Sequence, residues 1–131
     1  SQLLKVKKIQ NIREKNWNIF NQLINSLSTN KLYLIKPRKK STSAFHILAL
    51  IFKTTKLAND FKKVFQDKKV AATFHYVPLH KSTMGKKFCN YKLPLTENIY
   101  SRVVRLPLYA EMTKKEIRKI SLLIKNFIIQ K

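Results

Sequence analysis

The chain has 131 residues, which suits one domain that can bury roughly two thirds of the surface its unfolded form exposes. Apolar residues make up 44% of the sequence and include 8 Phe, which excludes general disorder even though 28 Lys and Arg against 6 Asp and Glu leave a net charge of +22. The single cysteine excludes an internal disulfide and fits a reducing compartment.

The basic charge raises nucleic-acid binding as an alternative function, because Lys and Arg that neutralise phosphates release counterions. Lys supplies 23 of the 28 basic residues and is spread along the whole chain, whereas bidentate reading of bases and phosphates favours Arg. We therefore interpret the charge mainly as solvated surface and keep a basic nucleic-acid-binding protein as the alternative.

No segment predicts export or insertion into a membrane. The N-terminal stretch SQLLKVKKIQ lacks the apolar core of a signal sequence, and the longest apolar run, residues 44–52, is too short to cross a bilayer. We expect a cytoplasmic protein with no membrane partner.

The first predicted element is a helix over residues 3–27, where Ile, Leu and Phe recur at helical spacing between Lys, Asn and Gln. It is long for a globular helix, so residues 1–30 are expected to extend from this domain toward something else, with a small α/β domain over residues 31–131. Residues 28–43 contain Pro37 and the run RKKSTS, which predict an irregular connection with one short strand around LYLI.

The segment SAFHILALIF, residues 43–52, is almost continuously apolar and fits a buried strand or a buried helix. The amphipathic helix expected over residues 55–68 and the apolar stretch VAATFHYV, residues 70–77, favour a strand, and Pro78 ends the second strand. A right-handed crossover would make these two strands parallel, either adjacent or with a third strand between them.

The last third of the chain predicts two helices and a strand. Thr96 can cap a short helix that ends near Ser101, and VVRLPL predicts a third strand that Pro107 ends. Thr113 and Glu116 form a capping box, T-K-K-E, ahead of a helix with one apolar face. Together the elements predict an α/β fold with a few-stranded sheet flanked by helices.

Residues 74–88, FHYVPLHKSTMGKKF, hold His75, Tyr76, His80 and the only glycine, Gly85. Polar rings at the end of a strand, followed by a glycine loop, are where α/β proteins commonly place ligand contacts. A lone histidine in a strand is more often a buried, hydrogen-bonded residue, and this alternative stays open for His75.

Metal and nucleophile chemistry fit this region less well. His75, His80 and Cys89 lie close in sequence, but the spacing runs across Pro78 and no fourth ligand is nearby, so we expect no zinc site. Ser82 lacks the G-x-S-x-G context of an activated serine. We assign no catalytic, cofactor-binding or metal-binding residue.

The stretch FHYVPLHKSTMGKKF, followed by RVVRLPLYAEMTKKEI, closely resembles the C-terminal domain of sugar-nucleotide aminotransferases of the DegT/DnrJ/EryC1/StrS family. Members of that family carry HY-[IV]-PLH, a glycine loop, and RLPL before the last helix. The resemblance extends upstream through NDFKKVFQDKKVAATF and SAFHILALIF, and more loosely through the first helix. Within the family the sequence is most similar to dTDP-4-amino-4,6-dideoxygalactose transaminases of enterobacterial common antigen and lipopolysaccharide biosynthesis.

The resemblance implies the small C-terminal domain of a fold-type I, pyridoxal-phosphate-dependent homodimer that transfers an amino group, usually from glutamate, to a dTDP-4-keto-6-deoxy sugar. By the match to HY-x-PLH it also implies that His75, Tyr76 and His80 bind the nucleotide-sugar substrate. Lys81 could add a charge for a phosphate, although an ordinary surface lysine is the stronger interpretation.

In the family a larger N-terminal domain binds the cofactor and carries the Schiff-base lysine, and no lysine here corresponds to it. We therefore expect a fragment that is not catalytic alone, holds no pyridoxal phosphate by itself, and depends on an N-terminal cofactor-binding domain. Whether it is a functional split subunit or a degenerate relic stays open.

Overall fold

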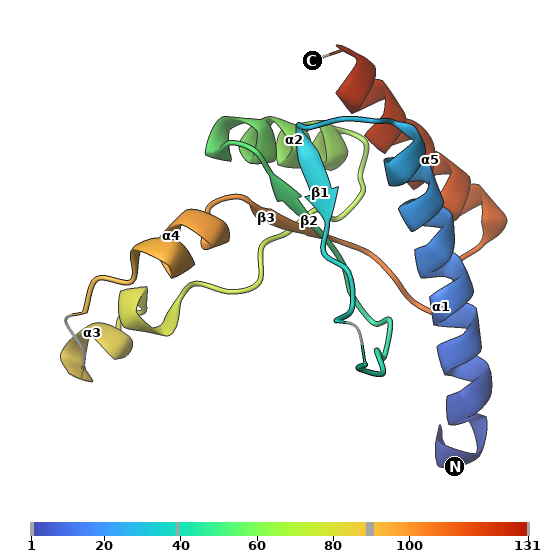
Figure 1. The fold of residues 1–131 in the computed structure, drawn as a ribbon, viewed down its shortest axis with the longest axis horizontal. Helices are drawn as coiled ribbons and strands as arrows, with labels where there is room; N and C mark the ends of the chain where they lie inside the picture. The colour runs from blue at the N-terminus through green and yellow to red at the C-terminus, as the bar shows by residue number, and fades with distance from the viewer. Residues whose placement is uncertain (1, 39, 89–90, 131) are drawn as a thin grey trace.

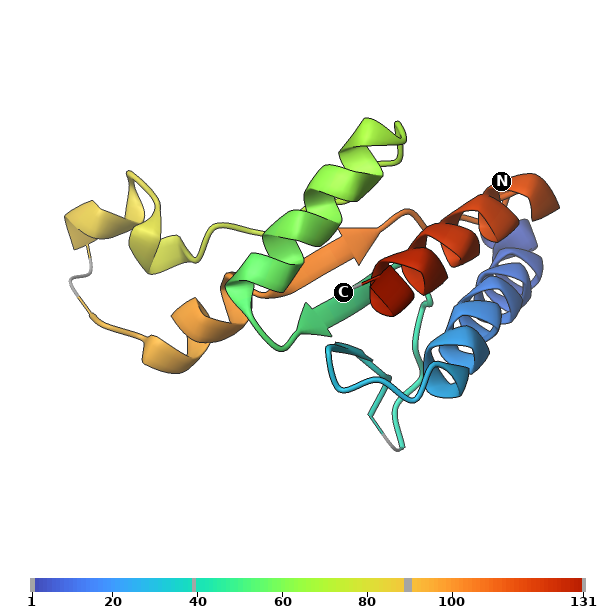
Figure 2. The same ribbon diagram turned by 90° about the horizontal axis from the view of Figure 1, so that it is seen from above.

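The computed structural model describes residues 2–38, 40–88 and 91–130. These residues form a three-stranded sheet, helices that pack against it, and an arm of short helices that projects from one end of the sheet (Figure 1). Seen from above, α2 and α5 lie across the same face of the sheet, and α1 runs beside α5 (Figure 2). The predicted α/β architecture, with a few-stranded sheet flanked by helices, is confirmed.

The sheet contains β1 (Leu32–Leu34), β2 (Leu48–Phe52) and β3 (Val103–Leu106), in the order β1-β2-β3 with both pairs antiparallel. Side chains alternate between its two faces. In β2, Leu48, Leu50 and Phe52 are completely buried, whereas the residues between them are half-buried on the other face. The core therefore lies on one side of the sheet only.

Helix α2 (Thr55–Asp67) covers that side because its apolar residues recur at helical spacing. Thr54 caps the helix, and its side chain accepts a hydrogen bond from the backbone N–H of Leu57 at 3.2 Å. The Phe61 ring is fully buried, with centroids 4.8 Å from that of Phe52 and 5.1 Å from that of Phe127. This aromatic cluster joins α2, β2 and α5.

Two longer helices complete the core: α1 (Gln2–Ser26) and α5 (Lys114–Gln130). The capping box of α5 is confirmed, because the Thr113 N–H donates to Glu116 Oε2 at 2.8 Å and the Glu116 N–H donates to Thr113 Oγ1 at 3.2 Å. In α1, Trp17 and Phe20 are buried, whereas Leu3 is 81% exposed. The division of the chain at residue 30 stays a prediction.

The predicted strand at residues 70–77 is wrong. Only Thr73 pairs with the sheet, through an isolated antiparallel bridge to Arg105. Before Thr73, the next hydrogen-bonded pair would place residue 71 opposite Pro107, which has no N–H to donate. After Thr73, the chain turns away from β3, and Phe74 packs edge-on against Tyr100. The segment at Thr73 and strand β2 are both antiparallel to β3. The segment at Thr73 therefore runs parallel to β2 with β3 between them, which is one of the two arrangements expected.

Two predicted element starts also need correction. β2 begins at Leu48 rather than at residue 43, because Phe45 adopts φ 43° and its N–H bonds to Ser43 Oγ at 3.1 Å, a local turn that interrupts extended backbone. Helix α4 (Pro94–Tyr100) begins before Thr96, so Thr96 is not its cap; Leu93 occupies that position without a side-chain bond, and the proline follows it.

The arm is defined as residues 74–88 and 91–100. It contains the short helix η1 (Leu79–Lys81), α3 (Gly85–Phe88) and α4, and it projects away from α1 and α5 (Figure 1). Its position brings the sequence segment with the predicted site residues to the end of β3.

Candidate ligand-binding site

His75 and Tyr76 meet Arg105 of β3 where the arm leaves the sheet, and we call these three residues the Arg105 cluster. The His75 and Tyr76 rings stack with centroids 4.2 Å apart and planes 15° apart. Nη1 of Arg105 lies 2.8 Å from Nε2 and 3.0 Å from Nδ1 of His75. Tyr76 is 75% exposed, whereas the other two residues are half-buried.

Electrostatics keeps the His75 ring neutral near pH 7. Loss of solvent, and then the positive charge of Arg105, lower the pKa of His75 below its ordinary value of 6.5. A neutral imidazole has a nitrogen lone pair that can accept a hydrogen bond from the guanidinium. His75 is half-buried and lies outside the strands, so it is not a core histidine.

Arg105 belongs to the sheet face that α2 and α5 leave uncovered. Its partner in β2 is Ala49, and the adjacent row on the same face consists of Tyr33, Ile51 and Val103. Tyr33 is 56% exposed and the other members are half-buried. The guanidinium therefore stands on a mostly apolar, accessible surface.

His80 lies in a second cluster, formed with Lys81 and Glu97. Its Nε2 is 3.1 Å from Glu97 Oε1, and Lys81 Nζ donates to Glu97 Oε2 at 2.6 Å. The hydrogen bonds from Lys81 and then from His80 lower the pKa of Glu97 to about 2, so the carboxylate is charged near neutral pH. With only 8% of its side chain exposed, His80 connects η1 to α4 inside the arm.

Gly85 permits the turn between η1 and α3 because a side chain would collide with the backbone. A Cβ placed on Gly85 would lie 1.7 Å from the carbonyl oxygen of Leu79. The Gly85 N–H donates to Ser82 Oγ at 2.9 Å, and that hydroxyl donates to the Leu79 carbonyl at 2.8 Å. The glycine is thus required by close approach rather than by a positive φ.

Of the three predicted substrate-binding residues, the structure brings His75 and Tyr76 into contact, whereas His80 bonds to Glu97 on α4. Their binding of a substrate stays a prediction. Sequence reasoning missed Arg105 as a site residue. The available signal was a charged residue between two buried apolar ones in a predicted strand, which places it on the opposite face of the sheet.

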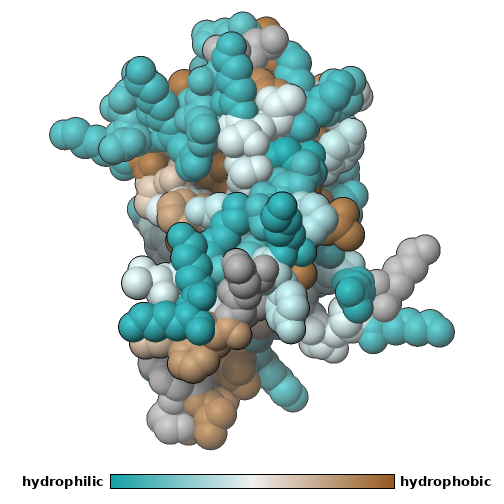
Figure 3. Space-filling model, turned by 90° about the vertical axis from the view of Figure 1, so that its left-hand side faces the viewer, coloured by the Kyte–Doolittle hydropathy of each residue, from teal (hydrophilic) through white to brown (hydrophobic). Residues whose placement is uncertain are grey.

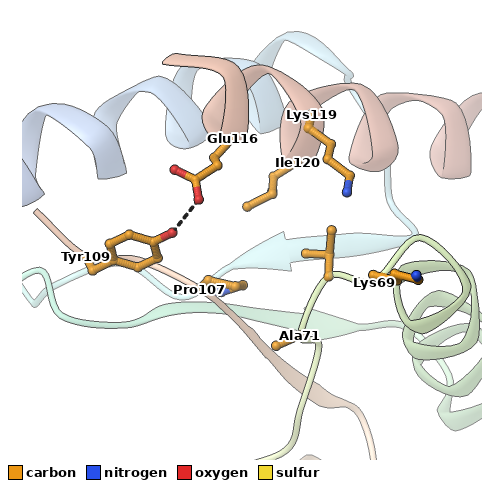
Figure 4. A pocket seen from close by; sticks show the side chains of 8 residues that line it. Lys69, Ala71, Pro107, Tyr109, Glu116, Lys119 and Ile120 are labelled. Carbon is orange, nitrogen blue, oxygen red and sulfur yellow. Dashed lines mark hydrogen bonds between the residues drawn. The ribbon is translucent and has the colours of Figure 1, made fainter. Parts of the chain in front are cut away.

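A separate cavity of about 190 Å³ lies between α5 and the turn after α2 (Figure 4). The Tyr109 hydroxyl donates to Glu116 Oε1 at 2.8 Å, which raises the pKa of Tyr109, and Lys119 Nζ donates to the backbone carbonyl of Lys68 at 2.9 Å. Three of its polar side chains are therefore already engaged. The cavity is lined by Lys69, Val70, Ala71, Pro107, Tyr109, Glu116, Lys119 and Ile120.

The residues do not fit a resident metal or a complete pyridoxal phosphate site. Over residues 2–38, 40–88 and 91–130, no group of three or more His, Cys, Asp or Glu could hold a metal ion; Cys89, weighed as a ligand, lies outside these ranges. Every described lysine is half-buried or exposed, so none occupies the enclosed, desolvated environment that activates an amine.

Comparison with known proteins identifies the family. Residues 1–125 match the model of the DegT/DnrJ/EryC1/StrS aminotransferase family, so the chain belongs to this family. A curated relative, described as an uncharacterised protein of Methanocaldococcus jannaschii, is 26% identical over 135 residues. That match covers 97% of this chain and 34% of the relative, so the chain spans about a third of the relative's length.

Solved aminotransferases share the fold. TlmJ from Streptoalloteichus hindustanus has a TM-score of 0.88 at 17% identity, over 98% of this chain and 34% of its own. PseC from Helicobacter pylori, an aminotransferase involved in the biosynthesis of pseudoaminic acid, has a TM-score of 0.87 at 16% identity, and the match covers 100% of this chain and 36% of PseC.

In the part of this chain that the structure describes, no helix is both long enough and apolar enough to span a bilayer.

Proposed function

We propose that this chain is the C-terminal part of a pyridoxal-phosphate-dependent sugar-nucleotide aminotransferase, and that its own role is to bind the nucleotide sugar. The family match over residues 1–125 supports amino transfer as the activity of the whole enzyme. The observation that carries the role of this chain is the stacked pair of His75 and Tyr76 beside Arg105, on a sheet face that α2 and α5 leave uncovered.

In this proposal the cofactor supplies the electron sink for amino transfer and is bound by an N-terminal domain together with the Schiff-base lysine. The Tyr76 ring offers the substrate a stacking face and a hydroxyl. Neutral His75 can donate to or accept from a sugar or phosphate oxygen. His80, whose ring Glu97 holds through Nε2, is the third residue that we propose as a substrate contact.

For the substrates we propose a dTDP-4-keto-6-deoxy sugar as the acceptor and glutamate as the donor, in a cytoplasmic pathway of lipopolysaccharide or enterobacterial common antigen synthesis. The motifs HYVPLH and RLPL support this choice. The role of PseC as an aminotransferase in the biosynthesis of pseudoaminic acid supports amino transfer as the reaction.

The N-terminal domain, and a second subunit as in the homodimeric family, are proposed as partners. Large apolar side chains project from the arm: Leu79 is 84% exposed, Phe88 83% and Leu95 79%. Hydrophilic side chains cover most of the face shown in Figure 3, and hydrophobic ones gather toward its lower end. Apolar groups exposed at this density mark a surface for protein contact.

Substrate binding can be tested on the 131-residue chain with dTDP-glucose, a stable analogue, in a ¹H–¹⁵N NMR titration. We expect the shifts to concentrate at residues 73–76, 80 and 105. Tyr76→Ala should weaken binding about fivefold or more, as loss of a stacking face does. Tyr91→Ala is the matched control, because Tyr91 is equally exposed, at 75%, on the same arm. Equal losses in both variants would refute the assignment.

Amino transfer requires a second experiment, in which the chain is co-expressed with the N-terminal cofactor-binding domain of a family member. The expected result is a complex that converts a dTDP-4-keto sugar and glutamate to the amino sugar, detected by mass spectrometry. A complex that binds pyridoxal phosphate but forms no amino sugar would refute the proposed activity. Steeply salt-dependent binding of duplex DNA, without nucleotide-sugar binding, would favour the nucleic-acid alternative.

A further inference from the structure

Arg105 differs from the other basic residues of this lysine-rich chain in where its charge is held. It lies in the middle of the pairing between β2 and β3, opposite Ala49, and its backbone also bridges to Thr73. The main chain is therefore fixed on both sides, and the side chain is half-buried. A guanidinium on such a rigid base loses little further freedom when it binds a ligand.

Neither of the two ion pairs that Glu97 makes, with His80 and with Lys81, includes Arg105. The Arg105 side chain contacts the His75 ring, whose lowered pKa leaves it neutral at pH 7. A half-buried cation surrounded by Ile51, Val103 and a neutral ring is incompletely compensated, so an anion from outside would be bound favourably.

The contacts of the side chain also define the shape of the anion. Only Nη1 of Arg105 is used by His75, so Nε and Nη2 remain as a planar pair of donors. Two such donors match two oxygens of one phosphate group. The Tyr76 ring, stacked on His75 and 75% exposed, offers a flat surface beside that phosphate for the sugar or base attached to it.

We propose that Arg105 binds the diphosphate group of a nucleotide sugar, with His75 as the residue that positions the guanidinium. The inference rests on the proposed function for the nature of the ligand. It assigns the phosphate to a residue outside the HYVPLH segment. Lys81, the basic residue directly after that segment, is already neutralised by Glu97 at 2.6 Å and is therefore the weaker candidate.

The test uses the 131-residue chain, with dTDP, inorganic pyrophosphate and thymidine as separate probes. We expect the Nε–Hε signal of Arg105 in the wild-type chain to shift with dTDP and with pyrophosphate at millimolar concentration, and not with thymidine. This measurement needs no substitution and so does not depend on whether a variant folds.

Arg105→Gln should weaken dTDP binding about tenfold to a hundredfold, the usual effect of losing hydrogen bonds to a charged group. Arg118→Gln, at an exposed position on α5, removes the same charge and is the matched control, with a change below about twofold. Because both variants lower the net charge by one, non-specific attraction to the basic chain cancels in the comparison. Arg105→Lys should restore part of the affinity, since it keeps the charge but loses the two-pronged geometry.

Three results would overturn the inference: no shift of the Arg105 signal, equal losses for Arg105→Gln and Arg118→Gln, or a loss shown by Lys81→Gln instead. Failure of the proposed amino transfer is distinguishable, because it appears only in the assembled enzyme. If dTDP and pyrophosphate bind through Arg105 while the complex makes no amino sugar, the diphosphate site stands and the proposed activity falls.

Discussion

The substitution Gly85→Ala should displace the turn of the arm while the core stays folded. A Cβ at position 85 would lie 1.7 Å from the Leu79 oxygen and 2.6 Å from the Leu79 carbonyl carbon, whereas ordinary contacts begin at 3.4 Å. Both atoms belong to the backbone, so no side-chain rotation can relieve the overlap. The two segments must separate by more than about 1 Å, which breaks the hydrogen bonds that Ser82 makes between them.

The expected size of the effect follows from how the arm is attached. Overpacking in a rigid core costs about 1–3 kcal/mol, which would lower Tm by roughly 3–12 °C in a chain of this length. Here the cost is limited by the free energy of opening an exposed turn, because the arm can rearrange without disturbing the aromatic cluster around Phe61. We therefore expect Tm to fall by less than about 3 °C.

Hydrogen exchange and ¹H–¹⁵N spectra can separate these effects. The amides of residues 79–88 should shift and lose protection in Gly85→Ala, and those of α2 and α5 should not. Lys86→Ala, one position further along α3 at an exposed site, is the control and should leave the turn unchanged. If the alanine variant kept the wild-type signals over residues 79–88, the close approach of Gly85 to Leu79 would be wrong.

Three further predictions test the core, the arm and a helix cap. Phe61→Ala should cost about 3–5 kcal/mol in urea unfolding because the ring is fully buried among aromatic neighbours, and a loss below about 1 kcal/mol would contradict that packing. The depressed pKa of Glu97 gives stability that is present above pH 4.5 and is lost as the pH falls toward 2, so the Tm difference between wild type and Glu97→Gln should shrink over that range. The exposed Glu14→Gln serves as its control, and a constant difference would argue against the ion pair. Thr113→Ala should cost about 1 kcal/mol through loss of the α5 cap, and unchanged unfolding would exclude the capping box.

The three long helices, α1, α2 and α5, could be predicted from the sequence because their determinants are local. The capping box of Thr113 and Glu116 lies within four residues of sequence, and the apolar periodicity of α2 needs no information from elsewhere. The segment at residues 70–77 could not be predicted in the same way. Its apolar composition suits a strand, but pairing depends on the edge of β3, where Pro107 withholds a donor thirty residues later in the chain.

The candidate site could be predicted only in part, for the same reason. His75 and Tyr76 could be singled out from the sequence because both belong to the HYVPLH segment, but adjacency alone does not predict that their rings stack, since consecutive side chains in extended backbone point to opposite sides. Arg105 could not be placed beside them from sequence, because the face on which it lies depends on the register of β3 against β2 and on the Thr73 bridge. Long-range pairing, not residue type, decides which side chains share the open face.

The two histidines of the segment have neighbours of opposite charge, and this separates their roles. Glu97, with a pKa of about 2, presents a constant negative charge to His80, and Lys81 balances that charge. Arg105 presents a positive charge to His75, and neither of the Glu97 ion pairs includes Arg105. An incoming diphosphate would therefore meet a nearly neutral group at the turn of the arm and a net cation at the sheet. In the proposed site this polarity would orient an anionic ligand with its charge toward β3, while the bond from His80 to Glu97 holds η1 against α4.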